Sequence, residues 1–272
     1  MEANPESLTE AMVKDLFALG VNRLSLGVQS FDDRLLKILG RVHDGDAARR
    51  AIDTARLRFD NVSVDLMCGL PTQTPGEFVS SLDEALACGV NHVSIYPLVI
   101  EEGTPFDSLL EAGEIPPCDD DEQAEMMESA ATVLEGAGMH RYEVASYAMP
   151  GYECRHNTAY WSAVPYLGIG SSAVSMRQND SCRVRIRDGK EIEKLNRRQM
   201  VAEDLMLAMR MTRGISEEYL DGACGELPEA KRVFDSLVEE GLVEHVQGSY
   251  RPTSRGWLCG NVLFGRVLDL AP

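Results

Sequence analysis

Polar side chains follow an apolar strand early in the chain. Residues 22–31 read Asn-Arg-Leu-Ser-Leu-Gly-Val-Gln-Ser-Phe, and Gln29 comes where the strand predicted by this pattern should end. A short helix expected over 35–39 stops at a glycine and delivers Arg41 and His43 nearby. In barrel-type α/β folds this end of a strand faces the active site. The segment therefore predicts an amide, a guanidinium and an imidazole together at one mouth of such a barrel.

Asp65 is a second candidate, because it lies inside the apolar run Val-Ser-Val-Asp-Leu-Met. A carboxylate in an apolar strand needs a partner, which favours a functional role. Gln29 and Arg41 have plainer alternatives. The amide can simply cap the helix that follows, and the guanidinium can be a solvated cation favoured by the helix dipole.

A third group of candidates lies in the segment 146–165, which is rich in Gly, Pro, Tyr and Trp and is predicted to be a long loop. It contains Cys154, His156, Asn157, Tyr160 and Trp161. Imidazole and thiolate are common metal ligands, so His156 is a candidate ligand, and Cys154 is either a second ligand or an inert thiol. The alternative is a packed loop whose polar tips are hydrogen-bonded.

A repeated unit supplies the elements that must position these groups. The segments 18–26 and 87–95 each combine a helix tail, a glycine and a strand, and looser copies lie at 59–67 and 136–144. Strands that alternate with helices in this way predict βαβ units on a parallel sheet. We therefore expect an α/β fold with a partial (β/α) barrel over residues 1–175.

Local signals predict where the helices begin. Asp44 and Thr74 are expected to start two amphipathic helices, and Ser7-Leu-Thr-Glu10 is expected to form a capping box for the first helix. Residues 2–5 look like the end of a strand, so we expect a chain truncated at its N-terminus. The strand 22–27 is then expected to present an unpaired apolar edge.

The C-terminal part, residues 176–272, has a different pattern. It predicts a hairpin over 179–191, helices over 196–211 and 229–240, a two-stranded wing over 242–252, and a last helix from Ser254. This order is typical of a winged-helix-like module. Glutamates 239, 240 and 244 line the wing, and their charge argues against binding to DNA.

The composition limits the classes of function. A formal net charge of −18 over 272 residues argues against a nucleic-acid surface, since phosphate binding needs clustered Lys and Arg. Seven cysteines are scattered at positions 68, 88, 118, 154, 182, 224 and 259 without a C-x-x-C pair, as a reducing cytoplasm permits. No apolar run approaches the length of a transmembrane helix. We therefore expect a cytoplasmic protein.

Several motifs together resemble the oxygen-independent coproporphyrinogen III oxidases of the radical S-adenosylmethionine (SAM) superfamily. They are Glu2-Ala-Asn-Pro-Glu, the stretch 22–31, Leu39-Gly-Arg-Val-His43, Val64-Asp-Leu-Met-Cys-Gly-Leu-Pro-Thr-Gln-Thr74 and Tyr96-Pro-Leu-Val-Ile-Glu-Glu-Gly-Thr-Pro-Phe106. The block His156-Asn-Thr-Ala-Tyr-Trp161 is more similar to that of the haem chaperones related to these oxidases. The resemblance covers nearly the whole chain, including the C-terminal helical module.

The resemblance implies a set of cofactor contacts. Glu2 would lie near polar groups of SAM, Gln29 and Asp65 near its ribose hydroxyls, and Arg41 would pair with its methionyl carboxylate. Pro97 and Val174 would line the pocket. His156, Asn157, Tyr160 and Trp161 would form the haem site, with His156 on the iron. The C-x-x-x-C-x-x-C loop that holds the family's 4Fe-4S cluster has no match in this sequence, so enzymatic activity by this chain stays open.

Three functions remain possible on this basis. The first is a haem chaperone-like radical SAM protein that lacks the cluster-binding segment, binds haem or porphyrin and delivers it to a haemoprotein client. The second is a coproporphyrinogen III oxidase, and the third is a cluster-free remnant that binds a protein partner. The oligomeric state stays open.

Overall fold

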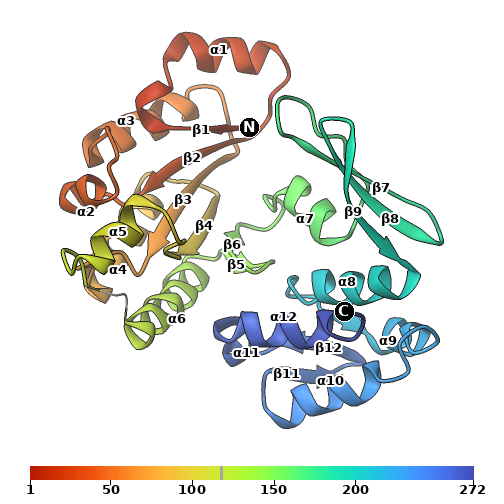
Figure 1. Cartoon of the computed structure of the whole chain (residues 1–272). Coiled ribbons are helices and arrows are strands. Elements are labelled where there is room, and N and C mark those ends of the chain that lie inside the picture. Colours follow the sequence, from red (N-terminus) through yellow and green to blue (C-terminus); the bar gives the residue numbers. More distant parts are fainter. Residues whose placement is uncertain (117–118) are drawn as a thin grey trace. The chain divides into compact units, whose positions relative to one another are not determined.

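The computed structural model describes residues 1–116 and 119–272, so Cys118 lies outside the described residues. The chain divides into two compact units. The first comprises 1–141 and 145–153, and the second comprises 142–144 and 154–272 (Figure 1). Residues 154–175 therefore pack within the C-terminal unit, whereas the sequence placed the boundary near residue 175.

The first unit is an α/β structure built on one sheet. Its strands are β1 (Glu2–Ala3), β2 (Leu24–Gln29), β3 (Val62–Cys68), β4 (His92–Pro97), β5 (His140–Arg141) and β6 (Ser146–Ala148). Its helices are the 3-10 turn η1 (Pro5–Ser7), α1 (Glu10–Ala18), α2 (Asp33–Ile38), α3 (Gly45–Arg56), α4 (Pro75–Ala87), α5 (Pro105–Glu111) and α6 (Asp120–Gly136). The sheet order is β1-β2-β3-β4-β6-β5, with β1 to β4 parallel and the last two strands antiparallel. The predicted α/β class is confirmed.

Helix starts follow the local signals, with one exception. Asp44 caps α3, and Thr74 forms a full capping box with Glu77 at α4, as predicted. The capping box predicted for Ser7 was wrong, because α1 begins two residues later. There Thr9 accepts the backbone N–H of Met12, while Ser7 donates its hydroxyl to the Asn4 carbonyl in the preceding turn.

Two expectations about strands were also wrong. The edge of β2 is not open, because β1 pairs with it in parallel and sets Glu2 opposite Ser25. The fourth copy of the repeat, 136–144, was expected to form a strand like the others. It yields only the two-residue strand β5, which pairs antiparallel with β6 at the edge of the sheet.

The two faces of this sheet differ in polarity. One face is apolar and packs against α1, α3, α4 and α6; its strand residues are Leu24, Leu26, Val28, Val62, Val64, Leu66, Val93 and Ile95. The other face carries Ser25, Ser63, Asp65, His92, Ser94 and Ser146. We call this second set the polar face. Its residues sit at alternate positions because successive side chains of a strand point to opposite sides.

Side chains on the polar face are hydrogen-bonded across neighbouring strands. Ser25 donates to Asp65 Oδ1 at 3.3 Å, Ser94 also bonds to the Asp65 carboxylate, and Ser146 donates to Ser94 at 3.2 Å. At the start of β4, His92 Nδ1 lies 2.8 Å from the Ser63 hydroxyl. Arg23 Nη2 lies 3.3 Å from the same nitrogen; a guanidinium can only donate, so Nδ1 accepts and the ring is neutral.

The second unit combines a small sheet with a helical module that resembles a winged helix, as predicted. Its helices are α7 (Arg155–Trp161), α8 (Arg197–Ala208), α9 (Glu217–Ala223), α10 (Ala230–Glu239), α11 (Ser254–Leu258) and α12 (Gly260–Leu268). Its strands are β7 (Val174–Gln178), β8 (Cys182–Arg187), β9 (Lys190–Asn196), β10 (Ile215–Ser216), β11 (Val243–Val246) and β12 (Ser249–Pro252). They form two antiparallel sheets, ordered β7-β8-β9 and β10-β12-β11.

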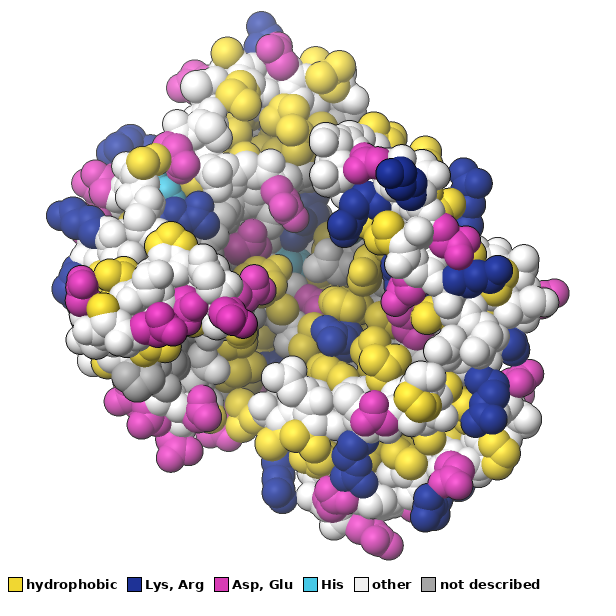
Figure 2. All heavy atoms as spheres, in the orientation of Figure 1, with side chains coloured by type: hydrophobic (Ala, Val, Ile, Leu, Met, Phe, Trp, Pro, Cys, Tyr) yellow, Lys and Arg dark blue, Asp and Glu magenta, His cyan; other side chains and the backbone are white. Residues whose placement is uncertain are grey.

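Charges of both signs are interspersed on the surface seen in Figure 2. Basic side chains on that face stand among acidic ones and do not merge into a continuous stripe. Within 1–116 and 119–272, no helix combines the length and the apolar character needed to cross a bilayer.

Close packing at Gly256 gives a test of the second unit. A Cβ at Gly256 would lie 2.0 Å from the Leu242 carbonyl oxygen, whereas one at Gly265 would meet nothing within 4 Å. We expect Gly256→Ala to lower the free energy of unfolding by about 1–3 kcal/mol. Gly265→Ala, the matched control, should leave it unchanged or raise it. Urea unfolding followed by tryptophan fluorescence measures this, because Trp161 and Trp257 both lie in the second unit. Equal unfolding curves would contradict the packing described.

Burial of neutral His92 predicts a pH dependence in the first unit. Burial, with Arg23 nearby, lowers the His92 pKa from 6.5 to about 3. The unfolded chain therefore binds a proton below pH 6.5 that the folded chain excludes, and this contribution to stability is lost as pH falls from 6.5 toward 3. We expect the wild type to lose up to about 1.4 kcal/mol per pH unit relative to His92→Asn in this window. Urea titrations at pH 7.5, 6 and 5 measure it, with exposed His140→Asn as the control. Parallel pH profiles of wild type and His92→Asn would refute the assignment.

Candidate functional site

The end of β2 gathers polar side chains around one glycine. The register of β2 against β3 shifts between Leu26 and Gln29, and Gln29 has a left-handed backbone with φ of 69°. Its side chain turns back over the strand, so that a Cβ at Gly27 would lie 3.1 Å from Gln29 Nε2 and 3.2 Å from Asn4 Oδ1. Only glycine fits here without displacing an amide. Arg41, delivered by the loop after α2 as predicted, donates to the same Asn4 oxygen at 3.4 Å.

Asp65 lies on the same face of the sheet. It bonds to Ser25, which stands two residues before Gly27 and therefore on the same side of β2. Burial raises the pKa of the Asp65 carboxyl, and the nearby Glu2 carboxylate adds to this, while the Ser94 and Ser25 hydroxyls oppose it. The structure thus brings Gln29, Arg41 and Asp65 to one side of β1–β3, with Glu2 at its exposed edge.

His43 and Pro97 are placed differently from the sequence expectation. His43 is buried beneath the loop, where Nε2 donates to the Val28 carbonyl at 3.2 Å and Nδ1 lies 3.1 Å from Glu6 Oε2. His43 therefore holds the end of β2 through this hydrogen bond and does not line the predicted active-site opening. In β4, alternation puts Pro97 on the side of the apolar residues, and Tyr96 takes the side of Asp65.

Sequence reasoning missed several members of the polar face. Arg23, His92 and Ser94 were not singled out, and Asn4 was passed over although it lies between Gln29 and Arg41. A signal was present, because β2, β3 and β4 carry polar residues at alternate positions, whereas strands of a parallel sheet covered on both faces are usually apolar throughout. That alternation indicates that one face of the sheet formed by β2, β3 and β4 is polar.

The predicted loop 146–165 is largely structured and includes α7. His156 and Tyr160 are four residues apart on this helix and share one side; both are exposed. Asn157 and Trp161 share the neighbouring side and are half-buried. The four candidate residues therefore form two stripes with different surroundings. Tyr160 extends the exposed stripe by stacking on Tyr166, with ring centroids 5.5 Å apart.

Trp161 attaches α7 to the body of the second unit. Its Nε1 donates to the buried carboxylate of Glu143 at 3.0 Å. The Arg210 guanidinium lies between two rings, 5.0 Å from the Trp161 centroid and 4.6 Å from that of Phe264. Burial lowers the pKa of Arg210, and the charge of Glu143 partly restores it. Trp161 is thus an anchor, which leaves the side of His156 exposed.

Cys154 and Val174 also belong to this unit. Cys154 precedes α7, its backbone N–H donates to the Tyr142 hydroxyl at 3.1 Å, and its side chain is buried, as expected of an inert thiol. Val174 begins β7, half-buried.

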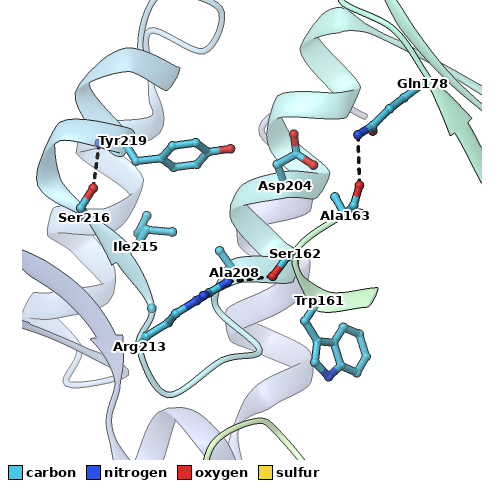
Figure 3. A pocket seen from close by; sticks show the side chains of 11 residues that line it. Trp161, Ser162, Ala163, Gln178, Asp204, Ala208, Arg213, Ile215, Ser216 and Tyr219 are labelled. Atoms are coloured by element: carbon cyan, nitrogen blue, oxygen red, sulfur yellow. Dashed lines mark hydrogen bonds between the residues drawn. The ribbon is translucent and has the colours of Figure 1, made fainter. Parts of the chain in front are cut away.

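A pocket lies beside the C-terminal end of α7 (Figure 3). Its volume is about 370 Å³, and its polar lining includes Ser162, Asp204, Arg213 and Tyr219. Figure 3 shows Tyr219 and Asp204 on opposite walls, with Arg213 extending across the base to Ser162.

In the described part of the chain, no group of three or more His, Cys, Asp or Glu residues is arranged to hold a metal ion. The described cysteines are all free thiols and lie at 68, 88, 154, 182, 224 and 259. These described thiols therefore do not form a ligand set for an iron–sulfur cluster.

The sequence and the fold are similar to those of characterised proteins. The family model for the radical SAM superfamily matches residues 1–85. The haem chaperone HemW of Bacillus subtilis is 33% identical over 98% of this chain and 75% of its own length. HemW of Synechocystis is 36% identical over 79% of this chain and 56% of its own length.

Among solved structures, coproporphyrinogen III oxidase (HemN) from Escherichia coli, described as a radical SAM enzyme, matches with a TM-score of 0.75. The match covers 99% of this chain and 68% of that protein at 18% identity, which shows a shared fold only. The first unit is thus a partial barrel of the radical SAM type. Given the extent and identity of the match to the Bacillus protein, this chain belongs to the HemW-type family of radical SAM proteins.

Proposed function

We propose that this chain is a haem-binding protein of the chaperone type, which carries haem on α7 for transfer to a haemoprotein client. The observation that carries the proposal is the division of α7 into an anchored side and an exposed side. Trp161 is held by Glu143 and Arg210, so the imidazole of His156 stays in solvent, where an axial position of haem iron can reach it.

Apolar side chains near α7 supply a surface for a macrocycle. The chain turns back after Ala163, and the segment that follows exposes Val164 to 48%, Leu167 to 70% and Ile169 to 86%. Together with Tyr160 these residues form an exposed apolar stretch, which in a monomer usually marks a binding surface. A flat porphyrin is a ligand of suitable chemistry. The names of the HemW relatives support the same proposal.

We further propose that the polar face of the first unit binds SAM. Arg41 offers a guanidinium to a carboxylate, Gln29 and Asp65 offer acceptors to ribose hydroxyls, and the partly exposed position of all three leaves them accessible. SAM supplies radical chemistry when a reduced cluster cleaves it; the residues described here only bind and orient it. Neither the oxidase nor the remnant hypothesis gains a specific observation in its favour.

Removal of the His156 imidazole should change haem binding. Titration of the 272-residue chain with haemin should give a Soret band characteristic of imidazole ligation, and His156→Ala should shift that band and weaken binding by at least about tenfold, because a metal–ligand bond is lost. His140→Ala removes an equally exposed imidazole from the first unit and should behave like the wild type. Identical Soret bands for wild type and His156→Ala would reject His156 as the ligand.

Removal of the Arg41 guanidinium should weaken SAM binding. A hydrogen bond to a charged group contributes about 1.5–3 kcal/mol, so Arg41→Ala should lower affinity by roughly tenfold or more. Equilibrium dialysis with labelled SAM measures this without any need for turnover. Arg58→Ala, which removes an exposed arginine elsewhere in the first unit, is the control. Equal SAM affinities for the two variants would exclude a carboxylate contact at Arg41.

A further inference from the structure

The pocket beside α7 is lined by one carboxylate that is ion-paired, Asp204, and by one guanidinium, Arg213, whose hydrogen-bond partner is a neutral hydroxyl. Asp204 in its wall accepts from Arg183 Nη2 at 2.5 Å, and the same guanidinium also pairs with Glu203. Burial raises the pKa of Asp204, and the Arg183 guanidinium opposes this shift. Arg213 donates to the Ser162 hydroxyl at 2.8 Å, and across residues 1–116 and 119–272 no carboxylate lies within ion-pair distance of it. Arg213 is therefore the group through which this pocket can hold an anion.

This arrangement is unusual for the composition of the chain. There are 44 acidic and only 26 basic residues, so most guanidiniums have acids to pair with, and several in this unit do. Arg213 is exposed, and its Nη2 donates a hydrogen bond to the Ser162 hydroxyl. Within residues 1–116 and 119–272, its Nε and Nη1 groups make no side-chain hydrogen bond, so they can donate to a ligand. A guanidinium with free donors beside a hydroxyl binds a carboxylate well, because the planar fork matches its two oxygens.

The position of the pocket links it to the C-terminal end of α7, one residue beyond Tyr160. Trp161, Ser162 and Ala163, at the end of the helix, line the pocket. At 1.5 Å per residue, Ser162 lies about 9 Å along the helix axis from His156. A haem carries its iron at the centre and two propionate carboxylates on one edge. With the iron on His156 and the ring over Tyr160, that edge can reach the end of α7.

We propose that Arg213 and Ser162 form a subsite that binds a propionate carboxylate of the haem held by His156. This inference rests on the proposed haem-binding function and adds a determinant of specificity to it. The pocket, about 370 Å³ in volume, takes the carboxylate arm, and the macrocycle stays on the apolar surface outside. The site then selects porphyrins with free carboxylates over their esters.

The test compares two ligands on the wild-type 272-residue chain and five variants, which include Ser162→Ala and His156→Ala. Haemin and haemin dimethyl ester, which lacks the anionic carboxylates, are titrated into wild type, Arg213→Ala, Arg213→Lys and Arg198→Ala, with the Soret band as the readout. Arg198 is an exposed arginine of the same unit that does not line the pocket, so its variant controls for net charge. Circular dichroism checks that each variant is folded.

We expect wild type and Arg198→Ala to bind haemin roughly tenfold more tightly than the diester. Arg213→Ala should lose about tenfold in haemin affinity, show no preference between the two ligands, and keep the wild-type Soret position because the iron ligand is unchanged. Arg213→Lys keeps the positive charge but lacks the planar fork, so its haemin affinity should lie between those of the wild type and Arg213→Ala. Ser162→Ala should weaken haemin binding in the same direction by a smaller factor.

Two results overturn the subsite and leave haem binding standing. They are equal affinity of the wild type for haemin and its diester, and unaltered haemin affinity in Arg213→Ala while His156→Ala still shifts the Soret band. A wild-type chain that does not bind haemin at all rejects the proposed function and the subsite together. The separate behaviour of the His156 and Arg213 variants distinguishes the two cases.

Discussion

The first unit depends on a lateral row of hydrogen bonds that runs across four strands. Ser25, Asp65, Ser94 and Ser146 stand side by side on β2, β3, β4 and β6, and each bonds to the next. A carboxylate placed in a sheet interior is costly unless such partners are present. The row also fixes the strand register, because a slip of one residue would turn Asp65 toward the apolar helices and Val64 toward the polar face. The polarity of the face thus follows from the row.

In the second unit, the orientation of α7 likewise depends on one side chain whose hydrogen bond is satisfied, here the indole of Trp161. The Trp161 ring packs beneath Arg210, and its one donor is satisfied by buried Glu143. An indole that is held through both its face and its N–H can occupy only one orientation. The rotation of the short helix about its axis is therefore fixed, and the exposure of His156 is a consequence. The cap contributes little, because Cys154 makes no side-chain hydrogen bond at the helix start.

How far the sequence could predict these features depends on the range of the forces involved. Caps at Asp44 and Thr74 act within one turn, so they were predictable. Gln29 was identified at a strand end, Arg41 after a short helix and Asp65 as a carboxylate inside an apolar strand, and the family resemblance gave their expected roles toward SAM. The pairing of β1 with β2, the row on the polar face and the partners of Trp161 join residues that are distant in sequence. No local pattern specifies such contacts, and for the same reason α7, a seven-residue helix without a polar cap, was taken for a loop.

Gln29 shows how the backbone shapes the end of β2. A left-handed backbone is unfavourable for a residue with a long side chain, and it persists only where surrounding contacts determine it. Here the irregular register of β2 re-aims the amide over Gly27, toward Asn4 and thus toward Arg41. The pleat alone already sets Gln29 on the side of Ser25 and Gly27, because these residues are spaced two positions apart. The left-handed backbone then turns the amide back over Gly27, next to Asn4, whose Oδ1 accepts a hydrogen bond from Arg41.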